Sequence, residues 1–157
     1  PLCIDADGIT LLAQHADLRE RIHGMPVVLT PHAGEFARIA GEVGTDRVAD
    51  TRRAAADLGV TVLLKGNVTV IAEPGGAVYL NAAGQSWAAT AGSGDVLSGV
   101  IGSLLAAGLS PGEAAAAAAF VHARAADLSA RDPGPAPAPT SASRILTHLR
   151  TALGSIL

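Results

Sequence analysis

A run of small and acidic residues at positions 91–99 holds the residue types best suited to chemistry in this sequence. Gly92 and Gly94 have no Cβ, so the backbone there can approach a ligand closely. The apolar stretch that follows predicts a helix, whose N-terminus offers free N–H groups and a positive dipole end to an anion. We predict that the N–H groups of Gly92, Ser93 and Gly94 form a phosphate cradle, with Asp95 as a catalytic base beside it. This arrangement suits phosphoryl transfer to a hydroxyl, although helix–sheet packing and capping would also account for these residues.

A second candidate segment, residues 64–69, follows an apolar run that predicts a buried strand. Lys65 can neutralise a phosphate, Gly66 permits close approach, and Asn67 and Thr69 offer hydrogen bonds. The segment is not a P-loop, because it lacks the Gly-Lys-Ser/Thr order and a following helix. It is equally consistent with a tight turn that carries a solvated lysine.

A third candidate segment, residues 30–35, also follows an apolar strand pattern and contains His32 and Glu35. In open α/β sheets, ligands bind beyond the carboxyl ends of the strands. Both side chains therefore stand where chemistry is expected. An ordinary turn into a helix, with Glu35 favouring the helix N-terminus, explains the same residues.

The elements that must position these segments follow an alternating pattern of apolar runs and amphipathic stretches. This pattern predicts an α/β fold with a mainly parallel sheet flanked by helices. We expect strands at 1–4, 26–30 and 60–64, an edge hairpin at 68–72 and 77–80, helices at 9–18, 34–40, 45–58 (capped by Thr45), 95–107, 110–129 and 142–153, and a loop at 131–141.

The overall composition limits the number of domains and the classes of protein to which the chain can belong. With 157 residues, 49% of them hydrophobic, the chain can form one domain or part of a larger one. A net charge of −3 argues against a nucleic-acid surface, and the alanine-rich run at 114–119 is too short to span a membrane. The single cysteine, Cys3, fits a reducing cytoplasm. The five histidines show no metal-ligand spacing, and we predict that His122, inside a helix, is structural.

Taken together, the segments resemble a known family. Residues 28–38, with Leu-Thr-Pro-His-Ala-Gly-Glu, resemble the Leu-Thr-Pro-His-Pro-Gly-Glu signature of the ADP-dependent NAD(P)H-hydrate dehydratases, which have the ribokinase-like fold. Residues 64–71 match the family's Lys-Gly-x-x-Thr-Val segment, 81–84 its Asn-x-x-Gly, 89–99 its Gly-Gly-Ser-Gly-Asp-Val-Leu and 4–8 its Asp-Ala-Asp strand end. Ala33, Ala91 and the Asn67-Val68 pair depart from the pattern. The family's upstream strands are absent from residues 1–157, which we expect to be a single, partial ribokinase-like domain.

The resemblance implies a lyase that uses ADP to dehydrate NADHX or NADPHX in the cytoplasm, as a homo-oligomer. It implies that His32 and Asp95 contact the hydrated nicotinamide, and that the nucleotide contacts Gly94 and the segment Lys65, Gly66, Asn67, Val68 and Thr69. Mg²⁺ is expected as a cofactor; its ligands are unknown, beyond a possible ordering of the ion by Glu35 through water. A kinase of the same fold and a nucleotide-binding fragment without turnover remain alternatives. The enzymatic interpretation requires these segments to meet around one phosphorylated ligand, with the Asp95 side chain in a cavity that it shares with His32 and Lys65.

Overall fold

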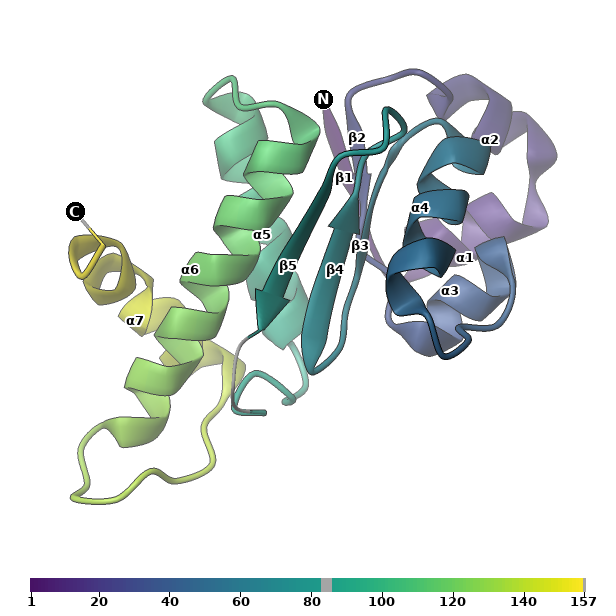
Figure 1. Cartoon of the computed structure of the whole chain (residues 1–157). Helices are drawn as coiled ribbons and strands as arrows, with labels where there is room; N and C mark the ends of the chain where they lie inside the picture. The colour runs from purple at the N-terminus through teal and green to yellow at the C-terminus, as the bar shows by residue number, and fades with distance from the viewer. Residues whose placement is uncertain (83–85, 157) are drawn as a thin grey trace.

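The computed structural model describes residues 1–82 and 86–156, and its centre is a five-stranded sheet (Figure 1). The strands follow one another in the order of the sequence: β1 (Leu2–Ile4), β2 (Val27–Leu29), β3 (Thr61–Leu64), β4 (Val68–Ala72) and β5 (Val78–Ala82). The first three are parallel, whereas β4 and β5 add to β3 as an antiparallel hairpin. The α/β fold and the edge hairpin are therefore as the sequence predicts.

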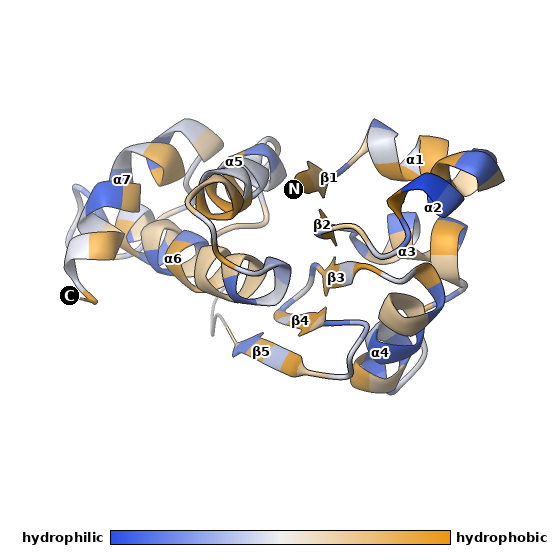
Figure 2. Ribbon diagram, turned by 90° about the horizontal axis from the view of Figure 1, so that it is seen from above, coloured by the Kyte–Doolittle hydropathy of each residue, from blue (hydrophilic) through white to orange (hydrophobic). Residues whose placement is uncertain are grey.

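Helices cover both faces of this sheet, as the view along the strands shows (Figure 2). One layer holds α1 (Asp7–Gln14), α2 (Ala16–Ile22), α3 (Ala33–Ala40) and α4 (Arg47–Leu58). The other holds α5 (Ser93–Ala106) and α6 (Pro111–Arg131), with α7 (Ala142–Gly154) packed on α6.

The strands are apolar along their whole length because both faces of the sheet are buried. Val27 and Leu29 point into the core under α1–α4, and Val28, between them, points into the core under α5 and α6. Ala114 and Ala118 of α6 are fully buried in this second core. Such small side chains let a helix lie close to the sheet, which explains why a core with few aromatic residues can be filled.

Three local predictions are wrong. The helix expected at 9–18 is two helices, because the backbone is extended at His15 and Arg19 donates hydrogen bonds to the last carbonyls of α1. Asp46, not Thr45, caps α4, since its carboxylate accepts the N–H of Ala49 at 2.9 Å. The helix expected to begin at Asp95 begins at Ser93, so the predicted cradle lies partly within its first turn.

The parallel strands place the candidate segments at one end of the sheet. The carboxyl ends of β1, β2 and β3 lie at the lower edge of the sheet in Figure 1, where the chain continues into Asp5, His32 and Lys65. The N-terminus of α5 reaches the same edge. In the described part of the chain, no helix combines the length and apolar character that a membrane span requires.

Candidate active site

A cavity of about 510 Å³ opens at the carboxyl end of the sheet, between the β3–β4 turn and helices α5 and α6. It brings together residues from three of the segments singled out above: His32, Lys65 and Gly94. Its wall consists of His32, Lys65, Gly66, Asn67, Thr69, Asn81, Ser86, Ala88, Ala89, Thr90, Ser93, Gly94, Leu97, Ala119, His122 and Ala123. Nine of these sixteen residues have polar or charged side chains, and the other seven are glycine, alanine or leucine.

Asp95 does not share this cavity, contrary to expectation. Ser93, Gly94 and Leu97 line it, whereas Asp95 is exposed. The helical repeat explains the difference: residues 93, 97 and 94 fall within about 100° of one another around α5, and residue 95 lies about 100° beyond that sector. The carboxylate is thus next to the cradle but on its solvent side.

The cradle depends on backbone geometry at Gly92. This residue has a φ of 81°, in the left-handed region. If it carried a side chain, the Cβ atom would lie 3.2 Å from the Cβ of Ala142 and 4.0 Å from Asp95 Oδ2. The conformation turns the chain sharply into α5. Glycine is required here by both the dihedral angle and the space.

Replacing Gly92 with alanine should therefore lower the free energy of unfolding by about 1–2 kcal/mol. Gly99→Ala is the matched control, because Gly99 lies inside the same helix and a Cβ atom there would point into open space. That change should raise stability by about 0.5–1 kcal/mol. Denaturant titration of both variants measures the contrast, and a Gly92→Ala protein as stable as Gly99→Ala would refute it.

Lys65 projects from the end of β3 into a group of carboxylates. Its Nζ lies 2.8 Å from Asp5 Oδ1 and 3.6 Å from Glu35 Oε2. A Cβ atom on Gly94 would lie 3.6 Å from Lys65 Nζ and 3.4 Å from Asp5 Oδ2. The Lys65–Asp5 ion pair therefore lies against the first turn of α5. Lys65 is thus placed beside the cradle, where a phosphate would meet both.

Asp5 is a residue whose side chain the sequence analysis did not assign to the site. Ser98 of α5 donates a hydrogen bond to its Oδ2 at 3.2 Å, and the next residue, Ala6, has a φ of 48°. A non-glycine residue with positive φ is strained and persists only where its surroundings demand it. Burial alone raises the pKa of Asp5, but the hydrogen bond and charge of Lys65, with the Ala6 N–H, hold it below its ordinary value.

The lowered pKa of Asp5 predicts a pH-dependent contribution to stability. Asp5→Asn should lower the free energy of unfolding by about 1–2 kcal/mol at neutral pH. Because the folded-state pKa is depressed, this contribution is complete above the unfolded value of about 3.9 and is lost as pH falls through the folded value. Unfolding curves of both proteins should converge in acid; a constant gap at every pH would contradict the assignment.

His32 and Glu35 form a reciprocal cap at the start of α3. His32 Nδ1 accepts the N–H groups of Gly34 and Glu35 at 3.0 and 3.2 Å, and Glu35 Oε2 accepts the N–H of His32 at 2.8 Å. Since Nδ1 is an acceptor, the proton of a neutral His32 resides on Nε2. The ordinary turn considered as an alternative is therefore real, but it also fixes His32 in the cavity wall.

The β3–β4 turn supplies Lys65, Gly66 and Asn67 to the cavity, and Thr69 of β4 adds a fourth residue. Arg47 donates to the carbonyl of Lys65 at 3.2 Å, and its guanidinium leaves no room for a side chain at Gly66. Asn67 Oδ1 accepts from Ser86 at 3.3 Å. Val68 is not part of the wall, because side chains alternate along β4.

Other wall residues have local roles that the sequence analysis missed. Asn81 donates to the carbonyl of Ala119 at 3.0 Å and so ties β5 to α6; Ala83 and Gly84, which complete the Asn-x-x-Gly match, lie outside the described residues. His122 lines the cavity rather than serving only the core, and Trp87 packs with α6 and α7 instead of lining it. A polar side chain on the sheet-facing side of α6 was the available signal for His122.

Comparisons with known proteins point to the same family as the sequence motifs. A profile described as NAD(P)H-hydrate dehydratase matches residues 1–148. The chain belongs to this family. It is 68% identical over 157 residues to the bifunctional NAD(P)H-hydrate repair enzyme Nnr of Mycobacterium leprae, covering 99% of this chain and 33% of that protein. It is 45% identical over 133 residues to the ADP-dependent (S)-NAD(P)H-hydrate dehydratase of Neisseria meningitidis, covering 82% and 45%.

Solved structures of similar proteins share the fold. An ADP/ATP-dependent NAD(P)H-hydrate dehydratase from Bacillus subtilis, co-crystallised with ATP/Mg²⁺ and soaked with CoA, superposes with a TM-score of 0.80 at 28% identity, covering all of this chain and 57% of that one. A ribokinase-like superfamily protein from Enterococcus faecalis gives a TM-score of 0.66 at 28% identity, covering 96% and 52%. The chain thus spans about a third of the length of the mycobacterial bifunctional relatives that it matches.

Proposed function

We propose that the protein containing this chain restores NADH and NADPH from their hydrates, NADHX and NADPHX, while consuming ADP. The observation that carries the proposal is the cavity in which Lys65 and the N-terminus of α5 lie side by side. A cation and a helix N-terminus are complementary to phosphate. Membership of the family gives this anion site its expected substrates.

The nucleotide and the hydrate are proposed to occupy different sides of the cradle. ADP would lie in the cavity, against Lys65, Gly66, Asn67, Thr69 and Gly94, with its phosphates on the N–H groups of Gly92 and Gly94. The Ser93 N–H, also predicted for the cradle, instead donates to the Thr90 carbonyl at 3.2 Å. The nicotinamide would contact His32 and Asp95. In phosphoryl transfer the attacking and leaving oxygens are roughly in line. A base on the solvent side of α5, across from the nucleotide cavity, is compatible with that requirement.

In the proposed reaction, Asp95 accepts the proton of the substrate hydroxyl as its oxygen forms a bond to the β-phosphorus of ADP. The bond from that phosphorus to the bridging oxygen breaks, and AMP leaves. The carbon–oxygen bond of the phosphate ester then breaks, driven by the electron pair of the ring nitrogen, and phosphate departs. The adjacent ring carbon loses a proton, and its C–H electron pair forms the double bond that restores the dihydronicotinamide. Lys65 and the α5 N-terminus offset the charge that develops on the transferred group.

Mg²⁺ belongs to the proposal as a companion of the nucleotide. It commonly binds through one or two carboxylates together with water and substrate phosphates. Asp5 and Glu35 flank Lys65 at the cavity, and the described residues contain no group of three His, Cys, Asp or Glu side chains that would hold an ion alone. Either carboxylate fits a water-mediated role, as expected for Glu35. When bound, the ion would neutralise phosphate charge.

The test is an assay of the full-length protein with NADHX and ADP. Recovery of NADH, followed by its absorbance, should match the AMP formed mole for mole. Parallel reactions with ATP, and with candidate alcohols plus ATP, test the kinase alternative. NADH recovery without ADP consumption, or phosphorylated alcohol as the main product, would reject the proposal. Nucleotide binding without any product would favour the alternative of a binding protein without turnover.

Three further expectations stay predictions under this proposal. The 157 residues would form part of one ribokinase-like domain, and the protein would be a homo-oligomer, which light scattering can test. A cytoplasmic location follows from the substrates, because ADP and reduced nicotinamide dinucleotides are metabolites of the cell interior.

A further inference from the structure

His122 is a buried histidine that the proposed mechanism does not use. It lies on α6 and lines the cavity, with 6% of its surface exposed. Its Nε2 is 3.1 Å from the hydroxyl oxygen of Ser93, which is 4% exposed and also lines the cavity. The two side chains therefore form a hydrogen-bonded pair in the cavity wall, directly beside the cradle.

The Ser93 hydroxyl depends on this neighbour for its orientation. Serines inside helices often bond to a carbonyl of the preceding turn. Ser93 is the first residue of α5, so no preceding helical turn exists. Its hydroxyl can either donate a hydrogen bond to His122 Nε2 or accept one from the Nε2–H, and this direction decides which way the hydroxyl hydrogen points.

The charge state of His122 limits the hydrogen bonds that its ring can make to Ser93. Burial lowers the pKa of His122, although an interaction with the Ser93 backbone acts in the opposite direction. Near neutral pH the ring is therefore neutral and carries one N–H. It can take either tautomer, and only the one protonated at Nε2 makes His122 a donor to Ser93.

We infer that His122 is a positioning residue: its Nε2–H donates to Ser93 Oγ and so directs the Ser93 hydroxyl hydrogen at a phosphate oxygen of the nucleotide. The inference rests on the proposed nucleotide site. Phosphate oxygens only accept hydrogen bonds, so a hydroxyl that binds one must donate to it. The lone pair of Ser93 Oγ is then left to accept from His122, which requires the proton on Nε2.

The test measures ADP and adenosine affinities of the full-length protein by calorimetry. His122→Leu should weaken ADP binding about tenfold, because the Ser93 hydroxyl is no longer held in the orientation that donates to the charged phosphate. Adenosine, which lacks phosphate, should bind equally well to both. His122→Gln should restore most of the ADP affinity, since the glutamine amide can donate from a similar position. In a Ser93→Ala background, His122→Leu should have little further effect.

Ser129→Ala is the matched control. Ser129 is buried on the same helix and hydrogen-bonded to Thr140, but it does not line the cavity. Its replacement removes a comparable hydrogen bond and should leave ADP affinity unchanged. If His122→Leu alters ADP and adenosine binding equally, or if its effect persists without the Ser93 hydroxyl, His122 is only structural and the inference is overturned.

Nitrogen-15 NMR of the His122 ring gives a readout that does not depend on affinity. With ADP bound, Nε2 should have the chemical shift of a protonated nitrogen and Nδ1 that of an unprotonated one. The opposite tautomer would overturn the inference while leaving the nucleotide site intact. Failure of the unmodified protein to bind ADP would instead reject the proposed function, and the inference with it.

Discussion

Asp95→Asn is expected to lower kcat of the full-length protein by about 10²–10⁴-fold, with little change in the Kd for ADP. Asparagine keeps the size of the side chain but cannot accept the substrate proton. Asp95 also lies outside the cavity proposed for the nucleotide, so its loss should not disturb ADP directly. Initial rates of NADH recovery and calorimetric titration with ADP separate the two quantities.

Asp17→Asn controls for the general effect of removing an aspartate from the first turn of a helix. Asp17 is exposed in the first turn of α2, in the layer on the other face of the sheet from α5. This variant should retain full turnover. Near-normal turnover of Asp95→Asn would remove Asp95 from the role of base, and an equal loss of ADP affinity would assign it to nucleotide binding instead.

Lys65→Ala is expected to have the largest effect on nucleotide binding, raising the Kd for ADP about 10–100-fold. The change removes a cation beside the cradle. It also leaves Asp5 and Glu35, 2.8 and 3.6 Å from Lys65 Nζ, without their shared partner. Their unpaired negative charge would then repel the phosphates. Calorimetry with ADP and with adenosine should show that only the phosphorylated ligand is affected.

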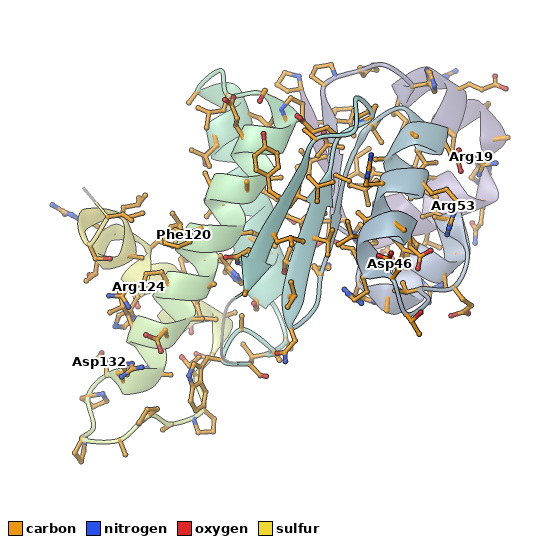
Figure 3. All side chains as sticks on the ribbon, viewed as in Figure 1. Arg19, Asp46, Arg53, Phe120, Arg124 and Asp132 are labelled. Carbon is orange, nitrogen blue, oxygen red and sulfur yellow. The ribbon has the colours of Figure 1, made fainter. Side chains whose placement is uncertain are left out.

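Arg53→Ala removes one positive charge elsewhere and provides the comparison. Arg53 is paired with Asp50 on α4, and it lies across the sheet from α5 and α6 (Figure 3). Its side chain is 52% exposed, so solvent screens the pair. ADP affinity should stay unchanged in this variant. Unchanged affinity in Lys65→Ala as well would exclude Lys65 from the nucleotide site.

The secondary structure was largely predictable because its signals are local. Apolar runs bounded by turn residues identified every strand, and the Ser110 to Glu113 capping box located the start of α6. The break at His15 was not predictable from periodicity. Arg19 reaches back to the carbonyls that end α1, and this contact depends on how the two helices pack.

The site was predictable to the extent that the strand ends define it. The residues following β2 and β3 do line one cavity with the start of α5, as parallel strands require. His32 both caps α3 and lines the cavity. Residue spacing could not predict this double role, because histidine is an unusual helix cap. Asp5 and Ser98 are 93 positions apart, and only folding brings their side chains together.

By itself the sequence determined the α/β class, the family and the three segments that contribute residues to the cavity. These depend on residue type and short-range order, which the chain carries in any conformation. The tertiary structure alone decided that Lys65 pairs with Asp5, that His122 holds Ser93, and that Asp95 lies outside the cavity. Those facts depend on the rotation of each helix and on contacts between distant residues, which packing against the sheet sets.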